Sequence, residues 1–154
     1  MSLVGLISDT HGKLRPQVLE AFEGVSVILH AGDIGNLDII TELETIAPVY
    51  AVHGNTDDFD VRARFGESIE RSIEGRRFVV AHGHLLGAPT PARLRAAFPD
   101  ADVIVYGHTH NPLVDEGKPL VVNPGAAGPA RFNLKPSVAI LDAQSLAIRF
   151  VDLY

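Results

Sequence analysis

The stretch VIVYGHTH, residues 103–110, is an apolar run that stops at a glycine, with two histidines just beyond it. A continuous run of Val and Ile is typical of a strand that is covered on both faces. Similar runs recur along the chain, and we expect a strand at each one: 3–8, 25–30, 48–53, 77–82, 102–107, 118–123, 137–142 and 146–153. The residues that end these other runs therefore bear on the role of the two histidines.

Helix signals lie between the early strands. Pro16 is placed for the first turn of a helix, Asn36 for the N-cap of a second, and Thr90 for the start of a third. The C-terminal third lacks such signals and its spacing predicts hairpins. Strands that alternate with helices, followed by strands alone, predict an α/β layered domain with a mostly parallel first sheet. We expect this single domain to occupy residues 1–154.

The composition narrows the class of protein. Of the 154 residues, 46% are hydrophobic and 21% are charged, which is typical of a globular chain. The sequence has no cysteine, so disulfides and thiolate metal sites are excluded. The formal net charge of −6 provides no basic stripe for a nucleic-acid backbone. No apolar run is long enough to cross a bilayer, and the N-terminus lacks the basic segment of a signal peptide, so we expect no membrane partner and a cytoplasmic location.

Five of the expected strands end in residues that bind metals. In an open α/β sheet the site lies at the carboxyl ends of the strands. Asp9/His11 and His108/His110 share a spacing of two, which in a strand points both side chains to the same side. The five strand ends read SDTH, HAGD, HGNTD, HGH and GHTH, and they supply Asp9, His11, Asp33, Asn55, His82, His108 and His110.

A structural interpretation competes at each position. A lone Asp or Asn after a strand is usually a turn residue or a helix cap, and a lone His is usually a structural residue. We assign His30, His53 and His84 to that structural class. Coincidence at five strand ends is much less expected than at one, so the seven residues are predicted to form one cluster.

The cluster suits two metal ions. Seven nitrogen and oxygen ligands are too many for one zinc ion, but they fit two metals about 3.5–4 Å apart. Two divalent cations against Asp9 and Asp33 leave two positive charges. A hydroxide and a singly charged phosphodiester together neutralise them. The ligand set therefore favours an anionic substrate, and phosphate esters are the natural class.

The ordered motifs D-x-H, GD, GN-x-D, H-G-H and G-H-x-H resemble the signature of the calcineurin-like metallophosphoesterase superfamily. The short chain, with HAGD, HGNTD, AHGH, GHTH and NPGA, is most similar to its small bacterial and archaeal phosphodiesterase branch. Each motif alone is weak, but the ordered set spans residues 9 to about 131. The resemblance implies a four-layer α/β/β/α sandwich, with two mixed sheets flanked by helices. It implies that the C-terminal third supplies much of the second sheet.

The resemblance also implies roles for the seven residues. One metal is held by Asp9, His11 and His110. The other is held by Asn55, His82 and His108, with Asp33 bridging the two. The implied reaction is in-line attack on phosphorus by a hydroxide that bridges the metals, with Asn55 and the metals stabilising the charge on the phosphoryl oxygens. Mn is the expected metal, with Ni, Co, Fe and Zn as alternatives because all accept such ligands.

The sequence departs from the family pattern at two positions. Many members have His after the GN pair, where this chain has Thr56, so protonation of the leaving group is unassigned. His84 and His53 are candidates for that acid. Asp57 is predicted to act as an acid or to orient a ligand or its loop. In NPGAAGPAR, Ala126 stands where the branch often has Ser, and Arg131 is a candidate contact for the substrate phosphate.

Three alternatives stay open at this point. A small retromer subunit has the same fold and acts mainly as a binding scaffold, but its ligand set is altered whereas this one is complete. A phosphomonoesterase is the nearest rival enzyme, although a dianionic substrate calls for additional cations. A metal-dependent amide hydrolase is disfavoured because the sequence has no HExxH motif. A homo-oligomer is compatible with the sequence, and a small phosphodiester is the predicted substrate.

Overall fold

The computed structural model describes residues 2–130 and 133–154, which form two five-stranded mixed sheets. The order of the first sheet is β10 (Ile148–Asp152), β9 (Ser137–Asp142), β1 (Leu3–Ile7), β2 (Val27–His30) and β3 (Val49–Ala51). β1, β2 and β3 are parallel, and β9 and β10 are antiparallel additions at the edge next to β1. β1 and β2 are short and almost fully buried, as their apolar sequences predict, whereas the edge strand β3 is only partly buried.

The second sheet has a parallel centre with an antiparallel strand at each edge. The order is β4 (Ser68–Ile73), β5 (Arg76–Ala81), β6 (Val103–Val105), β8 (Leu120–Asn123) and β7 (Leu113–Asp115). β5, β6 and β8 run parallel, while β4 pairs with β5 and β7 pairs with β8 in antiparallel fashion.

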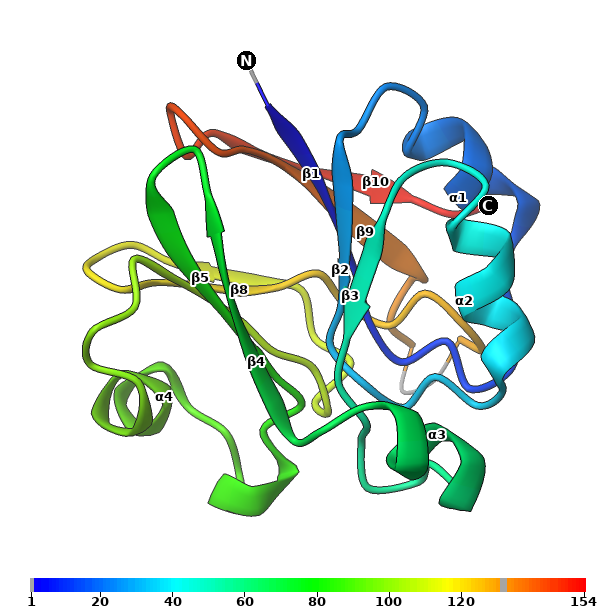
Figure 1. Ribbon diagram of the computed structural model, residues 1–154, viewed down its shortest axis with the longest axis horizontal. Coiled ribbons are helices and arrows are strands. Elements are labelled where there is room, and N and C mark those ends of the chain that lie inside the picture. Colours follow the sequence, from blue (N-terminus) through cyan, green and yellow to red (C-terminus); the bar gives the residue numbers. More distant parts are fainter. Residues whose placement is uncertain (1, 131–132) are drawn as a thin grey trace.

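Helices cover the outer faces, and Figure 1 shows the resulting layers. α1 (Pro16–Ala21) and α2 (Leu37–Leu43) pack on the first sheet, and α4 (Pro91–Ala97) packs on the second. The predicted four-layer α/β/β/α sandwich is confirmed. Two short elements, α3 (Phe59–Arg64) and the 3-10 helix η1 (His84–Leu86), lie near the lower ends of the sheets in this view.

The inner faces of the two sheets share one hydrophobic core. Leu6 and Leu29 of the first sheet pack in the same cluster as Phe78 and Val105 of the second, and all four side chains are fully buried. Burial of each such side chain contributes about 1.5–3 kcal/mol. This core fixes the two sheets face to face, so the loops at their ends have defined relative positions.

Helix caps follow the predicted chemistry. The Asn36 side chain accepts a hydrogen bond from the backbone N–H of Asp38, and the Thr90 side chain accepts one from Arg93. Pro16 begins α1 as expected. The prediction of three helix starts is therefore confirmed.

The C-terminal third contributes strands to both sheets. As expected, it builds much of the second sheet, to which it supplies β6, β7 and β8, while β9 and β10 extend the first sheet. The sequence analysis did not predict β4, β7 and α3. β4 reads SIERSI, and its mostly exposed side chains lack the apolar run that marks the central strands.

Candidate metal centre

The loops that follow β1, β2, β3, β5 and β6 meet at one end of the molecule, near the bottom of Figure 1. They bring all seven predicted ligands together. The rule for an open sheet pointed to these five strand ends, and in the structure three of them belong to the first sheet and two to the second. The cluster therefore lies where the carboxyl ends of two sheets converge.

The first group of side chains surrounds Asp9. Its Oδ1 lies 3.3 Å from His110 Nε2 and 3.6 Å from His11 Nε2. The two imidazole nitrogens are 3.3 Å apart. One carboxylate oxygen and two ring nitrogens thus converge on a single point, as the ligands of a metal ion do.

The second group surrounds His82. Its Nε2 lies 3.1 Å from Asp33 Oδ2 and 3.0 Å from Asn55 Oδ1. His108 Nδ1 is 3.1 Å from the same Asn55 oxygen. Asp33 Oδ2 is also 3.8 Å from His11 Nε2, so this carboxylate lies between the two groups. The geometry matches two neighbouring sites that share Asp33.

The backbone at the cluster is strained. Asp9, Asp33 and His11 have φ values of 54°, 53° and 47°, and His108 and His110 have 73° and 63°. Non-glycine residues rarely adopt this left-handed region, and clusters of them occur at functional sites. The spacing of two had predicted alternation along a strand. That reason is wrong, because left-handed loop residues, and not strand residues, aim these side chains.

The donor set fits a cation. Asp9 is fully buried, and among the described residues its Oδ1 accepts no hydrogen bond. Burial alone raises the pKa of Asp9, but the imidazoles of His11 and His110 outweigh it and hold that pKa well below its usual value. A buried carboxylate oxygen that faces only imidazoles is the arrangement that a divalent metal satisfies.

Neighbouring groups orient the ligands. His82 Nδ1 lies 2.8 Å from the Ala31 carbonyl, so it donates there and leaves Nε2 as the electron-pair donor toward the cluster. Asp9 Oδ2 accepts hydrogen bonds from the Ser8 hydroxyl at 2.6 Å and from the backbone N–H of His108 at 3.1 Å. Asp33 Oδ1 accepts from the backbone N–H of Thr56 at 3.0 Å.

A family model described as the calcineurin-like phosphoesterase superfamily domain matches residues 2–146. The chain belongs to this superfamily. A probable metallophosphoesterase of Methanothermobacter thermautotrophicus is 39% identical over 151 residues, which cover 90% of this chain and 84% of that protein. The predicted resemblance is confirmed.

Solved structures of the superfamily fold agree. The structure of an archaeal phosphodiesterase has a TM-score of 0.81 at 29% identity and covers 98% of this chain and 99% of that one. Vps29 from Chaetomium thermophilum has a TM-score of 0.82 at 23% identity, with 97% and 86% coverage. At that identity the likeness to Vps29 concerns the fold alone.

Asp57, in the superfamily's GN-x-D motif, lies behind the cluster and contacts the backbone. Its carboxylate accepts hydrogen bonds from the N–H groups of Gly54, Gly35 and Ile34, at 2.8, 3.0 and 3.2 Å. These contacts tie the loop after β3 to the loop after β2. They support the predicted orienting role of Asp57 more than a role as acid, because both of its oxygens are engaged as acceptors.

Two further residues bind the loops that carry the predicted metal ligands, and the sequence did not predict this role for either of them. Arg62 donates to three carbonyls of the loop after β3, and Asn123 donates to the Gly107 carbonyl and the Thr109 hydroxyl. Arg62 had no signal beyond its place in a charged stretch. Asn123 was visible as a polar residue that ends a buried apolar run.

The two candidate acids lie beside the second group. The His84 ring centroid is 5.4 Å from that of His82 and 6.1 Å from that of His53. His53 Nδ1 lies 3.2 Å from the Gly54 carbonyl, which supports a structural role. Burial lowers the pKa of His84, and the neighbouring His82 and His53 add to that effect. Arg131, the candidate phosphate contact, falls outside the described residues.

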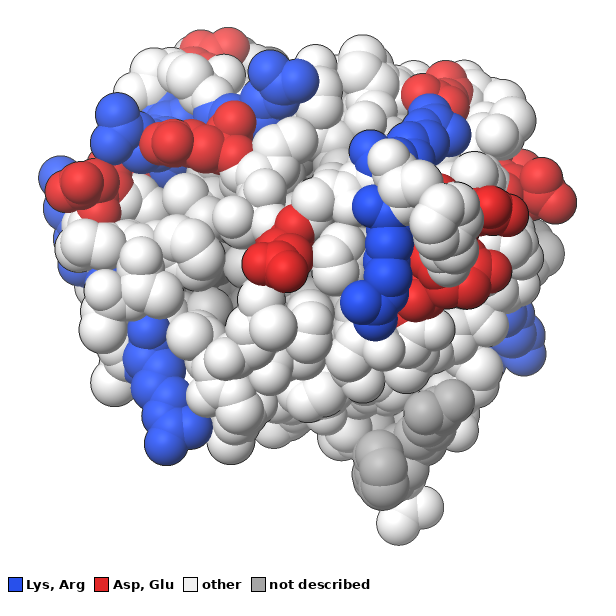
Figure 2. Space-filling model, turned by 60° about the horizontal axis from the view of Figure 1, so that its bottom comes forward, with Lys and Arg blue, Asp and Glu red and all other residues white. Residues whose placement is uncertain are grey.

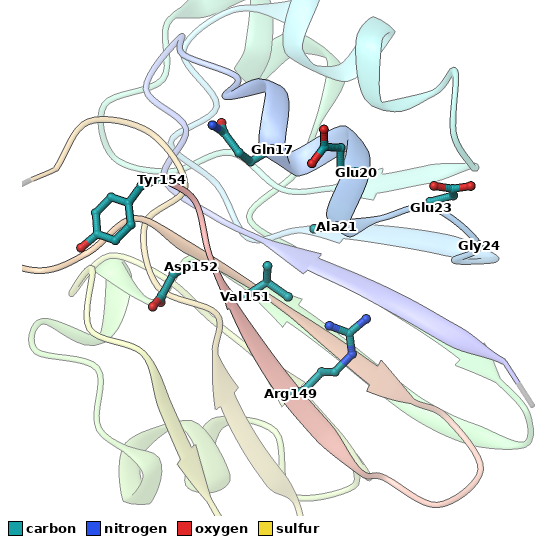
Figure 3. A pocket seen from close by; sticks show the side chains of 9 residues that line it. All are labelled: Gln17, Glu20, Ala21, Glu23, Gly24, Arg149, Val151, Asp152 and Tyr154. Carbon is teal, nitrogen blue, oxygen red and sulfur yellow. The ribbon is translucent and has the colours of Figure 1, made fainter.

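Other surface features are separate from the cluster. A hollow of about 760 Å³ lies between α1 and β10, where Figure 3 shows Glu20 and Asp152 on its two sides, with Arg149 farther along the strand. None of the seven predicted ligands lines it. On the face of Figure 2, the described Lys and Arg residues lie in separate groups, several of them beside Asp and Glu residues. Within residues 2–130 and 133–154, no helix combines the length and the apolar character that a membrane span needs.

Proposed function

We propose that the protein is a metal-dependent phosphodiesterase that hydrolyses small phosphodiesters. The observation that carries this proposal is the complete donor set, arranged as two groups that share Asp33. The name of the archaeal phosphodiesterase, whose structure this chain matches over almost its full length, supports it.

The charge of the site favours a diester over a monoester. In the described residues, no Lys or Arg is paired with the carboxylate of Asp9 or Asp33. Two divalent ions therefore leave a modest positive charge, which suits a monoanion. A phosphomonoester dianion requires additional cationic groups, so the monoesterase alternative is weaker.

Two divalent ions, when bound, polarise the phosphoryl group and lower the pKa of water enough to supply a nucleophile near neutral pH. The chain's residues hold the site for that chemistry. Asp33 presents its Oδ2 to both groups while Thr56 fixes its Oδ1. The Asn55 amide oxygen is held between His82 and His108, which leaves its amide nitrogen to contact a phosphoryl oxygen.

Mn is the metal we propose to test first, because nitrogen and oxygen ligands alone do not select among Mn, Ni, Co, Fe and Zn. We also propose that residues 1–154 act as one catalytic domain, which the shared core between the two sheets supports. The cytoplasmic location stays a prediction, as does a homo-oligomeric state. A binding scaffold is the second candidate, although the intact donor set favours catalysis.

The test uses metal-stripped protein with Mn, Ni, Co, Zn or Mg restored singly. Hydrolysis of an aryl phosphodiester and of the matching monoester is compared, and bound metal is counted by elemental analysis. Asp33→Asn and His108→Ala are assayed beside the wild type. We expect metal-restored diesterase activity that exceeds the monoesterase activity and that both variants lose.

Each other result contradicts a defined part of the proposal. Greater activity on the monoester would replace the diesterase assignment. Two bound metals without activity on either ester would favour the scaffold. Full activity in Asp33→Asn would place the reaction elsewhere on the protein.

A further inference from the structure

Arg62 lies outside the donor set but is bonded to the loop that carries Asn55. Its Nε donates to the Asp57 carbonyl at 2.7 Å, and its Nη2 donates to the Asn55 and Gly54 carbonyls at 3.1 and 3.4 Å. One guanidinium therefore engages three carbonyls of a four-residue loop. The planar fork presents these donors from two separate nitrogens, Nε and Nη2, whereas an ammonium presents its three donors from one point on a flexible stem.

The position of Arg62 is itself anchored in the core. Its neighbour Val61 is fully buried in the cluster beneath α2, and Asp58 caps the start of α3. The opposite side of the same loop is held by Asp57 and Asp33, which accept its N–H groups. The loop is thus held in two ways: Asp57 and Asp33 bind its N–H groups, and Arg62 binds its carbonyls.

We propose that Arg62 is a positioning residue that sets the affinity of the second group of ligands for its metal, by holding Asn55 in place. The inference rests on the proposed function because it assumes that Asn55 binds a metal. Without Arg62 the three carbonyls turn to water, and the loop can rotate Asn55 away from His82 and His108. Residues that orient metal ligands typically contribute about 10- to 100-fold to metal affinity.

Arg64 provides a matched control. It lies on the same helix and carries the same charge, but its contacts are the ring of Phe65 and a 3.9 Å pair with Glu44. Arg62→Ala and Arg64→Ala therefore remove equal charge and equal side-chain volume. Only the first removes the contacts to the metal loop.

The experiment is equilibrium dialysis of Mn against the metal-stripped full chain, with bound Mn counted per chain. We expect two Mn sites in the wild type and in Arg64→Ala, and about 10-fold weaker binding of one Mn in Arg62→Ala. Arg62→Lys should recover only part of this loss. Thermal unfolding of the metal-free variants checks that both alanine variants fold equally well.

Wild-type Mn affinity in Arg62→Ala would overturn the inference, as would an equal loss in Arg64→Ala. A full recovery by Arg62→Lys would show that charge and not the fork of donors is responsible. If the wild type itself binds no second Mn, the proposed function fails before the role of Arg62 is reached.

A second feature, an apolar pocket next to His84, bears on which ester groups the substrate carries. A pocket of about 200 Å³ lies beyond His84, where η1, α4 and the start of β4 meet. Its walls are largely apolar. Its lining includes His84, Leu85, Leu86 and Phe98.

This pocket adjoins the metal centre through one side chain. His84 lines the pocket, and its ring packs 5.4 Å from that of the predicted ligand His82. Leu85 is 64% exposed at the same rim, which leaves apolar surface available next to a polar site. Burial of that surface by a ligand is favourable by about 25 cal/mol per Å².

We propose, on the basis of the proposed function, that this pocket binds an apolar or aromatic ester group of the phosphodiester. The anionic phosphate then lies at the metal centre and one uncharged substituent lies beyond His84. The pocket would favour aryl or branched alkyl esters over methyl esters.

The test compares diphenyl phosphate with dimethyl phosphate, which carry the same charge. Calorimetric binding to the Mn-loaded protein and inhibition of aryl diester hydrolysis are measured for wild type, Leu85→Ala and Leu19→Ala. Leu19 is 40% exposed on α1 and does not line the pocket. We expect Leu85→Ala to weaken diphenyl phosphate about 3-fold, within the range for lost apolar contacts, and to leave dimethyl phosphate unchanged.

Equal effects on both ligands, or no effect on diphenyl phosphate, would overturn the role of the pocket. A diphenyl phosphate that binds no tighter than dimethyl phosphate to the wild type would do the same. If neither ligand binds and no diester is hydrolysed, the proposed function itself is at fault.

Discussion

At the scale of single residues, the candidate centre depends on positions where no larger side chain fits. A Cβ atom on Gly54 would lie 2.0 Å from Asp33 Oδ1, and one on Gly107 would lie 2.1 Å from the Ser8 hydroxyl. These glycines let the backbone approach the carboxylates closely. The GN and GH pairs of the sequence therefore have a steric reason besides the ligands that they supply.

Gly54→Ala is expected to displace Asp33 and to lower diesterase activity by about 100-fold, because a shift of about 1 Å at a reactive centre has effects of that size. Gly66→Ala is the control, since its nearest contact would be an ordinary 3.8 Å and its φ is not positive. Activity and bound Mn are measured for both. Wild-type activity in Gly54→Ala would contradict the close approach.

His30 links protonation to stability. It is fully buried, its Nδ1 accepts from the Gly32 N–H, and its Nε2 donates to the Thr10 hydroxyl, which itself donates to the Ile34 carbonyl. Burial is the main cause that lowers the pKa of His30 to about 4 from 6.5. The folded state thus requires the neutral ring, as the structural assignment of His30 from the sequence implies.

As the pH falls, the ring of His30 binds a proton in the unfolded state before it does so in the folded state. The contribution of the neutral ring to stability is therefore complete above pH 6.5 and is lost as the pH falls toward 4. Between pH 7 and pH 5 we expect the wild type to lose about 2 kcal/mol of unfolding free energy through this residue. His30→Gln, which cannot titrate, should lose less over the same interval. Urea unfolding at both pH values measures the difference, and equal losses would contradict the assignment.

At the scale of elements, the helix caps and the central strands could be predicted from the sequence because their signals are local. The N-cap of α2 needs only Asn36 and the two residues after it, and the Val and Ile content of central strands such as β6 indicates a strand. β4 and β7 were missed because edge strands are held by pairing with β5 and β8, and not by their own composition. α3 was missed because its six residues bury only Val61.

Asn36→Ala is expected to destabilise the protein by about 1 kcal/mol, the usual cost of a lost N-cap. The loss arises because the backbone N–H of Asp38 would lose its acceptor at the start of α2. Thermal or urea unfolding measures it, and Asn36→Ser should restore most of the stability because Ser is also a good cap. An unchanged Asn36→Ala variant would mean that water replaces the cap at no cost.

At the scale of the whole molecule, one core between two sheets holds both halves of the centre. Asp9, Asp33 and Asn55 follow strands of the first sheet, whereas His82 and His108 follow strands of the second. The distances between these side chains therefore depend on how the sheets pack. Leu6, fully buried between them, lies only three residues before Asp9.

Leu6→Ala is expected to destabilise the fold by about 2–5 kcal/mol, because it leaves a cavity between the sheets. The exposed control Leu19→Ala should change the unfolding free energy by at most about 0.5 kcal/mol. Urea unfolding of the metal-free proteins compares the two. Similar losses in both would show that the core between the sheets is not the main source of stability.

The sequence by itself determined the types of ligand, the central strands, the helix caps and the family, because each is encoded in a few neighbouring residues. Only the tertiary structure decided which sheet each strand joins, since β9 pairs with the distant β1 and β10 then pairs with β9. It also decided that left-handed loop residues aim the ligands, and that Asp57 and Arg62 clamp the loop of Asn55. The bonds of Asp57 to Ile34 and Gly35 join distant segments, and the ligands come from both sheets, so the centre exists only once the two sheets have packed.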